Sequence, residues 1–175
     1  MSPDMDARAG APHVRLAGPD DAAAIREIYN QGIEDRVATF ETEPRTTDQI
    51  RAWFDDEGHP AVVAVDGGRV VAFGSLSGYR PRTCYAGIAE FSIYVRRGHR
   101  GNGLGRRTLA ALVEAARERG HWKLVSRIFV ENEASRRICA ITGFREVGVY
   151  RKHARLDGVW RDVVVVERLI DENLT

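Results

Sequence analysis

The chain has 175 residues, 43% of them hydrophobic and 29% charged, proportions typical of one globular domain with a sizeable core. Its 26 Lys and Arg residues against 25 Asp and Glu residues leave a net charge of +1, which gives no reason to expect a nucleic acid or an anionic membrane as a partner. The two cysteines, Cys84 and Cys139, lack metal-ligand spacing, so reduced thiols in a cytoplasmic protein are the simplest interpretation.

The first half of the chain is predicted to begin with a disordered leader over residues 1–12, which lack the apolar core of a signal peptide. A short strand at 14–16 is followed by a helix that Pro19 and Asp20 open. Thr46 and Gln49 have capping-box spacing ahead of a second helix. The segments predicted as strands here are 61–65 and 70–75, which flank Asp66-Gly67-Gly68-Arg69, a strong hairpin signal.

The second half alternates strands and helices around one central strand at 90–95. A helix with an apolar stripe follows and ends near Gly120, a plausible C-cap. The remaining predictions are a strand at 124–129, a helix ended by Gly143, and strands at 147–149 and 163–166. We expect one α/β (α+β) domain over residues 13–170 with a tail at 171–175.

The segment Arg100-Gly101-Asn102-Gly103-Leu104-Gly105 links the central strand to the next helix. A glycine-rich turn at a helix N-terminus directs backbone N–H groups at an anionic ligand such as a phosphate. Leu104 and Gly105 stand where a P-loop requires Lys and Ser or Thr, and Arg106 replaces the third glycine of a dinucleotide-binding fingerprint. The loop therefore predicts a phosphate site of another kind, against the alternative of a basic turn before a surface helix.

Glu90 begins the central strand, and strand alternation places it on one face with Ser92 and Tyr94. The residues between them are apolar and belong to the opposite face. A carboxylate in such a strand can accept a proton from an amine that must attack an electrophile. The alternative is a solvated strand residue, but an idle carboxylate in a central strand would be costly. We interpret Glu90 as a general base.

These features resemble the GCN5-related N-acetyltransferase (GNAT) superfamily, through the R-x-x-G-x-G pattern of residues 100–105 and the order of elements over 13–170. The resemblance implies a mixed, mostly antiparallel sheet of about seven strands flanked by about four helices. Segments 37–44, 80–85, 132–144 and 157–162 narrow it to the phosphinothricin N-acetyltransferase branch. Within that branch the chain looks closest to the enzymes that acetylate arsinothricin-type glutamate analogues.

The resemblance implies that acetyl-CoA is the co-substrate and that no metal takes part. The residues expected to bind acetyl-CoA are Ile93, Tyr94, Val95, Arg100, Gly101, Asn102, Gly103, Leu104, Gly105, Asn132 and Ser135. For Asn132 a helix N-cap is an equally good interpretation, and both roles are compatible. A local separation of strands beside residues 93–95 is implied as well. His13, His59, His99 and His121 show no metal-ligand spacing. His153 is a candidate second base, but a surface side chain is the simpler interpretation.

The acceptor is predicted from paired positive charge. Arg80 and Arg82 would point the same way in an extended segment, and paired guanidinium groups suit an acidic acceptor such as a glutamate analogue. Surface arginines are the alternative. Tyr85 and Tyr94 are candidate hydrogen-bond partners of the acceptor, and Phe40 either packs on it or belongs to the core. Residues 37–44 are implied to approach the site with help from a partner subunit, so we expect a homodimer.

Cys139 departs from the resembled pattern, in which a Tyr or His stands at this position. A thiol could donate a proton to the leaving thiolate, but a packed helix residue is the simpler interpretation, and the general acid stays unassigned. Two other functions remain open: a protein or peptide N-terminal acetyltransferase, and a non-catalytic acyl-CoA-binding module. The module would have no need for Glu90.

Overall fold

The computed structural model describes residues 10–175, so most of the predicted leader lies outside the described residues. Its first half contains β1 (His13–Leu16), η1 (Pro19–Asp21), α1 (Ala22–Asp35), α2 (Thr47–Arg51), η2 (Ala52–Asp55), β2 (Ala61–Asp66), β3 (Arg69–Gly78) and η3 (Thr83–Tyr85). The second half contains β4 (Ile88–Val95), α3 (Leu104–Glu118), β5 (Lys123–Phe129), α4 (Glu133–Ile141), β6 (Arg145–Leu156), β7 (Val159–Leu169) and η4 (Asp171–Asn173).

The strands form one seven-stranded sheet in the order β1-β2-β3-β4-β5-β7-β6. Every neighbouring pair is antiparallel except β4 and β5, which run parallel because α3 carries the chain across the sheet between them. β4 therefore lies in the middle of the sheet, as its apolar sequence predicted. The mixed sheet and the four α-helices within residues 10–175 confirm the predicted fold class.

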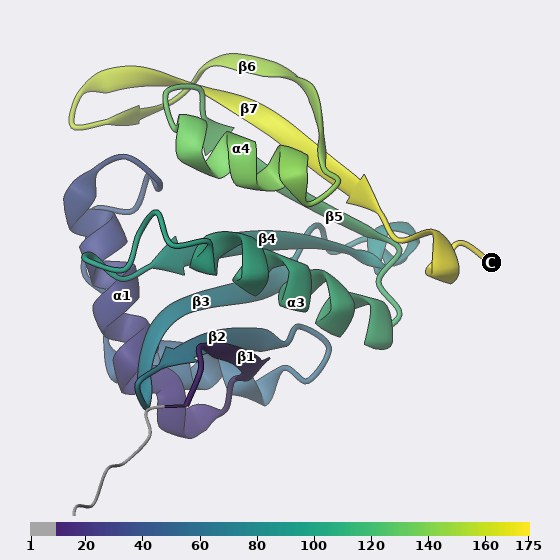
Figure 1. Cartoon of the computed structure of the whole chain (residues 1–175). Helices are drawn as coiled ribbons and strands as arrows, with labels where there is room; N and C mark the ends of the chain where they lie inside the picture. The colour runs from purple at the N-terminus through teal and green to yellow at the C-terminus, as the bar shows by residue number, and fades with distance from the viewer. Residues whose placement is uncertain (1–9) are drawn as a thin grey trace, which may run out of the picture.

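Helices cover both faces of the sheet (Figure 1). α3 and α4 pack on one face over a core that includes Phe91, Leu109 and Cys139. α1 and α2 pack on the other face, where Ile25 and Phe73 are fully buried. Successive residues of the central strands thus point into two different cores, which explains why these strands read as almost continuously apolar.

The local signals of the sequence are confirmed at several element ends. The Thr46 hydroxyl accepts a hydrogen bond from the Gln49 N–H, and the Gln49 side-chain oxygen accepts one from the Thr46 N–H. Gly120 and Gly143 follow α3 and α4 with φ of 81° and 85°, the left-handed conformation that ends a helix. The predicted hairpin is formed by β2 and β3.

The last two strands are longer than predicted. The expected strand at 147–149 lies in the first half of β6 and the one at 163–166 in the middle of β7, and the two strands pair along most of their lengths. Asp157 and Gly158 form the turn, with φ of 48° and 79°, as the two-residue hairpin turn requires. The second half of β6 was not predicted as a strand because its residues are mostly charged. This edge strand is exposed on nearly all of its length, so its sequence shows no alternation of apolar and polar residues.

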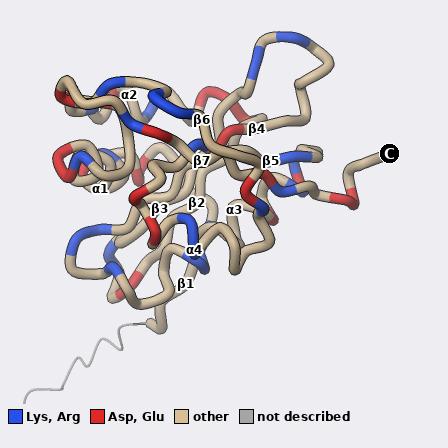
Figure 2. The backbone as a smooth tube through the Cα atoms, turned by 90° about the horizontal axis from the view of Figure 1, so that it is seen from above, with Lys and Arg blue, Asp and Glu red and all other residues tan. Residues whose placement is uncertain are grey.

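Positive and negative residues are mixed along the whole tube of the chain (Figure 2). Many of them pair between elements that are distant in sequence, such as Arg36 of the segment after α1 with Asp157 of the β6–β7 turn. At the C-terminal end, the Asn173 side chain donates hydrogen bonds to the carbonyls of Arg117 and His121. Among the helices of residues 10–175, none is long and apolar enough to cross a membrane.

Candidate active site

The loop between β4 and α3 turns on three glycines, Gly98, Gly101 and Gly103, with φ of 82°, 83° and 76°. Such φ values favour glycine. A Cβ atom placed on any of them would meet no atom within 4 Å, so the loop borders open space. α3 begins directly after it at Leu104, and the N–H groups of a first helical turn have no partner inside the helix. The loop is therefore a suitable cradle for an anionic group.

Leu104 and Gly105 contribute to this cradle through their backbone only. The Leu104 side chain is buried against Val71 and Ala72. A Cβ on Gly105 would lie 2.8 Å from Cδ1 of Ile138 in α4, so the glycine permits the close approach of α3 and α4. The absence of a side chain at Gly105 therefore serves helix packing.

The arginines around the loop are largely bound to other protein groups. Arg100 donates from Nε to the carbonyl of Val95 at 3.1 Å and from Nη2 to Asp35 at 2.7 Å. Arg97 also pairs with Asp35, which lies at the end of α1. Burial alone would raise the pKa of Asp35, but the hydrogen bonds from the two arginines hold this pKa below its ordinary value. Asp35 thus fixes the position of Arg100 at the loop.

Three further arginines near the loop differ in their surroundings. Arg96 is buried, donates to the carbonyl of Val70 and pairs with Glu27, so its charge is directed away from the loop. Arg107 donates to the carbonyl of Pro12. Arg106 is exposed. Of these three, Arg106 keeps its guanidinium directed to solvent beside the start of α3.

β4 and β5 separate part of the way along the sheet. Their parallel pairing consists of three residue pairs and ends where Glu90 meets Val125. Beyond that point β4 continues to Val95 with β3 as its partner, while β5 continues to Phe129 with β7. Figure 1 shows the two strands diverging. The edge of β4 that carries Ile93 and Val95 thus faces a gap, the separation that the family resemblance implied.

Glu90 lies at the point where the two strands part. Both of its carboxylate oxygens are 2.8 Å from Nη2 of Arg127 in β5. The two side chains keep exposed fractions of 27% and 45%, so the ion pair is open to solvent. The Glu90 carboxylate is therefore ion-paired and also accessible to solvent.

A cavity of about 170 Å³ lies next to Glu90 on the face that α1 and α2 cover. Ser77, the cross-strand partner of Glu90, lines it, and so does Ser92, which shares a face of β4 with Glu90. The full lining consists of Tyr29, Trp53, Phe73, Ser75, Leu76, Ser77, Ser92 and Tyr94. Hydroxyl groups and aromatic rings thus surround a small space beside the carboxylate, a lining suited to a small polar acceptor.

Tyr94 belongs to the wall of this cavity and also to the core. Its ring stacks on Phe73 with 5.4 Å between centroids and lies 5.0 Å from the ring of Tyr29. A Cβ on Gly32 of α1 would lie 2.6 Å from the Tyr94 ring, so α1 approaches closely here only because that residue is glycine. Burial raises the pKa of the Tyr94 phenol, which stays protonated at neutral pH.

Asn132 is the N-cap of α4, as the structural interpretation predicted. Its Oδ1 accepts from the Ser135 N–H at 3.1 Å, and its Nδ2 donates to the carbonyl of Val37 at 3.3 Å. Asn132 therefore joins α4 to the segment that follows α1, next to the gap between β4 and β5.

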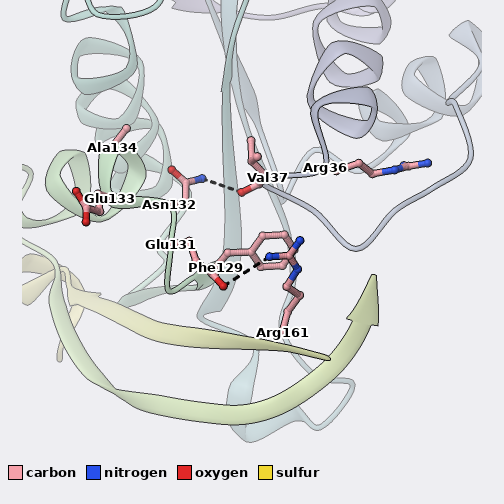
Figure 3. A pocket seen from close by; sticks show the side chains of 8 residues that line it. All are labelled: Arg36, Val37, Phe129, Glu131, Asn132, Glu133, Ala134 and Arg161. Atoms are coloured by element: carbon pink, nitrogen blue, oxygen red, sulfur yellow. Dashed lines mark hydrogen bonds and ion pairs between the residues drawn. The ribbon is translucent and has the colours of Figure 1, made fainter. Parts of the chain in front are cut away.

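A second cavity of about 300 Å³ lies between these segments (Figure 3). Arg36 and Val37 border it on one side and the start of α4 on the other, while Arg161 reaches over the ring of Phe129. Its lining residues are Arg36, Val37, Phe129, Glu131, Asn132, Glu133, Ala134 and Arg161.

Four of the residues predicted to bind the acceptor, unlike Tyr94, do not line the cavity beside Glu90. Arg80 is fully exposed, with its guanidinium 5.2 Å from the ring centre of Tyr79, and Arg82 is exposed just before η3. Tyr85 packs edge-on against Tyr79. Phe40 packs against Phe129 with 4.8 Å between ring centroids, which favours the core interpretation. None of these predicted residues lines the 170 Å³ cavity that the structure describes.

Cys139 is buried on α4, and burial raises the pKa of its thiol to about 12. Such a thiol holds its proton firmly, and its packing in the core on the α3 side supports the structural interpretation. Within residues 10–175, no group of three His, Cys, Asp or Glu side chains could hold a metal ion.

Sequence reasoning did not find several residues of the site. The partnership of Arg127 with Glu90 depends on the pairing of two strands that are 37 positions apart, and no local pattern carries that information. Ser75 and Ser77 alternate in β3 and were visible as a polar face, but only the strand register places them beside Glu90.

A sheet that opens beside a glycine-rich helix start, with a carboxylate at the opening, is the architecture of an acyl-CoA-dependent transferase. The chain belongs to the Acetyltransferase (GNAT) family, whose pattern matches residues 23–144. Two curated relatives are similar over most of its length. The L-methionine sulfoximine/L-methionine sulfone acetyltransferase of Salmonella typhimurium is 31% identical, over 91% of this chain and 95% of its own. The phosphinothricin N-acetyltransferase of Streptomyces coelicolor is 32% identical, over 89% of this chain and 94% of its own.

Solved structures agree in fold. The yncA protein of Salmonella typhimurium, solved with its cofactor acetyl-CoA, matches with a TM-score of 0.89 and 30% identity over 93% of this chain and 95% of its own. A ribosomal-protein-alanine N-acetyltransferase from Brucella melitensis matches with a TM-score of 0.86 and 30% identity, over 90% of this chain and 99% of its own. These likenesses cover both faces of the sheet and the glycine loop.

Proposed function

We propose that this protein transfers the acetyl group of acetyl-CoA to the α-amino group of a glutamate-analogue amino acid. The proposed acceptors are of the phosphinothricin, methionine sulfoximine or arsinothricin type, and acetylation would detoxify them and confer resistance. The observation that carries the proposal is Glu90, which lies where β4 and β5 part and beside a small cavity lined by hydroxyl groups. Two free cysteines fit a cytoplasmic enzyme.

On the donor side, we propose that the diphosphate of acetyl-CoA lies against the N–H groups of residues 100–105 and that Arg100 stays at its side. The open space above Gly101 and Gly103 fits such a group. The free edge of β4 at Ile93 and Val95 offers backbone groups to the amides of the pantetheine arm, in the manner of an added strand. Asn132 and Ser135 border the same gap.

Glu90 has the role of the base. The acceptor arrives as an ammonium ion, and Glu90 takes one proton from it directly or through one water. The neutral amine attacks the thioester carbonyl carbon, a C–N bond forms, and the C–S bond breaks with its electron pair leaving on sulfur. The remaining excess proton leaves nitrogen as the amide forms. A CoA thiolate is a good leaving group, so the buried Cys139 thiol is not needed as an acid.

Arg80 and Arg82 are proposed to bind the distal acid of the acceptor. Both are exposed, and Arg80 lies against the ring of Tyr79, so an acidic ligand can reach them from solvent. Tyr85 and Phe40 lie on segments at the edges of the same site. A distal acid is the feature that phosphinothricin, arsinothricin and glutamate share.

A homodimer is part of the proposal. The edge strand β6 is exposed along nearly its whole length and carries Val147, Val149 and Tyr150 at about half exposure. Exposed apolar edge strands favour pairing with a partner.

Light scattering on the wild type should give twice the monomer mass, and Val149→Glu with Tyr150→Glu should give monomers. Leu16→Glu, on the exposed edge strand at the other end of the sheet, is the matched control. A monomeric wild type would contradict this part.

A thiol-release assay with acetyl-CoA tests the function. The acceptor panel contains phosphinothricin, methionine sulfoximine, glutamate, peptides with free N-termini and a polyamine. Turnover should be highest with an amino acid that carries a distal acid or sulfoximine group, and the polyamine should not react. Turnover with peptides alone would contradict the proposal.

A protein or peptide N-terminal acetyltransferase is the second candidate, because the Brucella melitensis structure of the same fold has the name ribosomal-protein-alanine N-acetyltransferase. A peptide acceptor needs an open groove for the residues after its N-terminus. The cavity beside Glu90 is small, about 170 Å³, and Tyr29 and Trp53 belong to its wall, which favours the amino-acid acceptor. The peptides in the panel separate the two functions.

A further inference from the structure

Arg127 has no part in the chemistry proposed above, although its guanidinium contacts the proposed base. In the part of the chain that the structure describes, Glu90 and Arg127 are each other's only ion-pair partner. One nitrogen, Nη2, is 2.8 Å from both carboxylate oxygens. The other guanidinium nitrogens have no acceptor among residues 10–175, so they are available to a ligand.

The strand geometry keeps Arg127 at the opening of the sheet. β5 pairs with β4 only as far as Val125, and Arg127 lies two residues further on, on the same face of the strand. On its other side β5 is held by β7, where Arg127 is opposite Val165. The hydroxyl of Ser126 donates to the carbonyl of Phe91 at 3.0 Å, across the start of the gap. The backbone under Arg127 is therefore fixed while its side chain faces the site.

The pair has the charges that an α-amino acid requires. A free amino acid carries an ammonium group and a carboxylate on the same carbon atom, so it matches a carboxylate and a guanidinium that lie in contact. Solvent-exposed ion pairs contribute little to stability, so the separation of Glu90 from Arg127 costs little. Two new charge-assisted hydrogen bonds to the acceptor would offset that cost.

We propose that Arg127 binds the α-carboxylate of the acceptor while Glu90 receives its ammonium group, so that Arg127 selects α-amino acids over other amines. The inference rests on the proposed function and adds a specificity-determining residue to it. Arg80 and Arg82 then serve the distal acid, and the acceptor is held at both ends. The ion pair between Glu90 and Arg127 is the resting arrangement that the zwitterion replaces.

The test compares phosphinothricin with its α-carboxamide, which keeps the amine and the distal acid and lacks only the α-carboxylate charge. The enzymes are the wild type, Arg127→Gln, Arg127→Lys and Arg69→Gln, the last an exposed arginine in the β2–β3 turn as a matched control. In the wild type, kcat/KM should favour the acid by about 10- to 100-fold. Arg127→Gln should lose that preference, mainly through a higher KM for the acid, whereas kcat/KM for the carboxamide should change little.

Arg127→Lys should restore part of the preference, because it keeps the charge but not the planar fork. Arg69→Gln should behave as the wild type. Thermal unfolding and acetyl-CoA binding, measured on each variant, verify that the fold and the donor site are intact. If Arg127→Gln lowers kcat/KM equally for acid and carboxamide, Arg127 only positions Glu90 and the inference is wrong. If the wild type acetylates peptides but neither form of phosphinothricin, the proposed function fails, and the inference fails with it.

Discussion

The carboxylate of Glu167 in β7 is ion-paired with the ammonium group of Lys123 in the adjacent strand β5. On its other side Glu167 also pairs with Arg145 of β6. The side chain keeps an exposed fraction of only 13%, so it ties three neighbouring strands together in a partly dry environment. The hydrogen bond from Lys123 is the main cause that lowers the pKa of Glu167 below its ordinary value of 4.5.

The first prediction concerns the pH dependence of stability. Because the pKa of Glu167 is lowered in the folded protein, its contribution is fully present above pH 4.5 and is lost as the pH falls through the lowered value. Glu167→Gln should reduce the free energy of unfolding by about 1–3 kcal/mol at pH 7. Urea titrations of both proteins should give a smaller difference in acid than at neutral pH. A difference that grows in acid, or an equal loss in the exposed control Glu57→Gln, would contradict this explanation.

Substitution of the proposed base should separate chemistry from binding. Glu90→Gln keeps the shape of the side chain but cannot accept the proton, so turnover should fall by about 10²- to 10⁴-fold. Acetyl-CoA binding, measured by calorimetry, should persist, because the glycine loop is at the far end of β4. Glu57→Gln, an exposed glutamate before β2 and outside both cavities, is the control. Unchanged turnover in Glu90→Gln would remove Glu90 from the mechanism.

The proposed acceptor arginines should act on one ligand only. Arg80→Ala combined with Arg82→Ala should raise KM for phosphinothricin by about 10- to 100-fold, the loss expected for hydrogen bonds to a charged group. KM for acetyl-CoA should stay unchanged, because the loop before β4 is remote from the start of α3. Arg51→Ala, in the exposed helix α2, provides a matched control. An equal loss for both ligands would indicate a disturbed fold instead.

Cys139 should be dispensable for catalysis. Its raised pKa of about 12 and its burial predict that thiol reagents label the exposed Cys84 in the native protein and reach Cys139 only after unfolding. Cys139→Ala should keep its turnover and lose about 0.5–3 kcal/mol of stability, as a small core truncation does. Mass spectrometry of the labelled protein and steady-state rates check both parts. A large loss of turnover in a folded Cys139→Ala variant would make the thiol a participant.

The fold was predictable wherever the pattern was local. Thr46 with Gln49, and the glycines Gly120 and Gly143, mark element ends through hydrogen bonds and φ values that neighbouring residues decide. The second half of β6 was missed because an exposed edge strand has no buried face to impose alternation. The Asp157-Gly158 turn was a usable signal for that hairpin, since both residues adopt positive φ.

The candidate site was predictable in its chain segments but not in its contacts. The role of Gly105 in helix packing depends on Ile138, and the engagement of Arg100 depends on Asp35. Both partners are far away in the sequence. Tyr94 was expected on a polar face, but aromatic residues of α1 and β3 enclose it. Strand alternation predicts on which face of the sheet a residue lies, whereas the tertiary fold decides which elements cover that face.

The short pairing of β4 with β5 has a mechanical consequence. Three residue pairs are the whole strand ladder between a four-stranded and a three-stranded half of the sheet, whereas the core under α3 joins both halves. An elongated ligand whose amides bridge the gap would extend the hydrogen-bond ladder between β4 and β5 and join the two halves of the sheet more firmly. Loading of the donor substrate and stiffening of the whole molecule would then be one event, visible as slowed amide hydrogen exchange in strands that the ligand never touches.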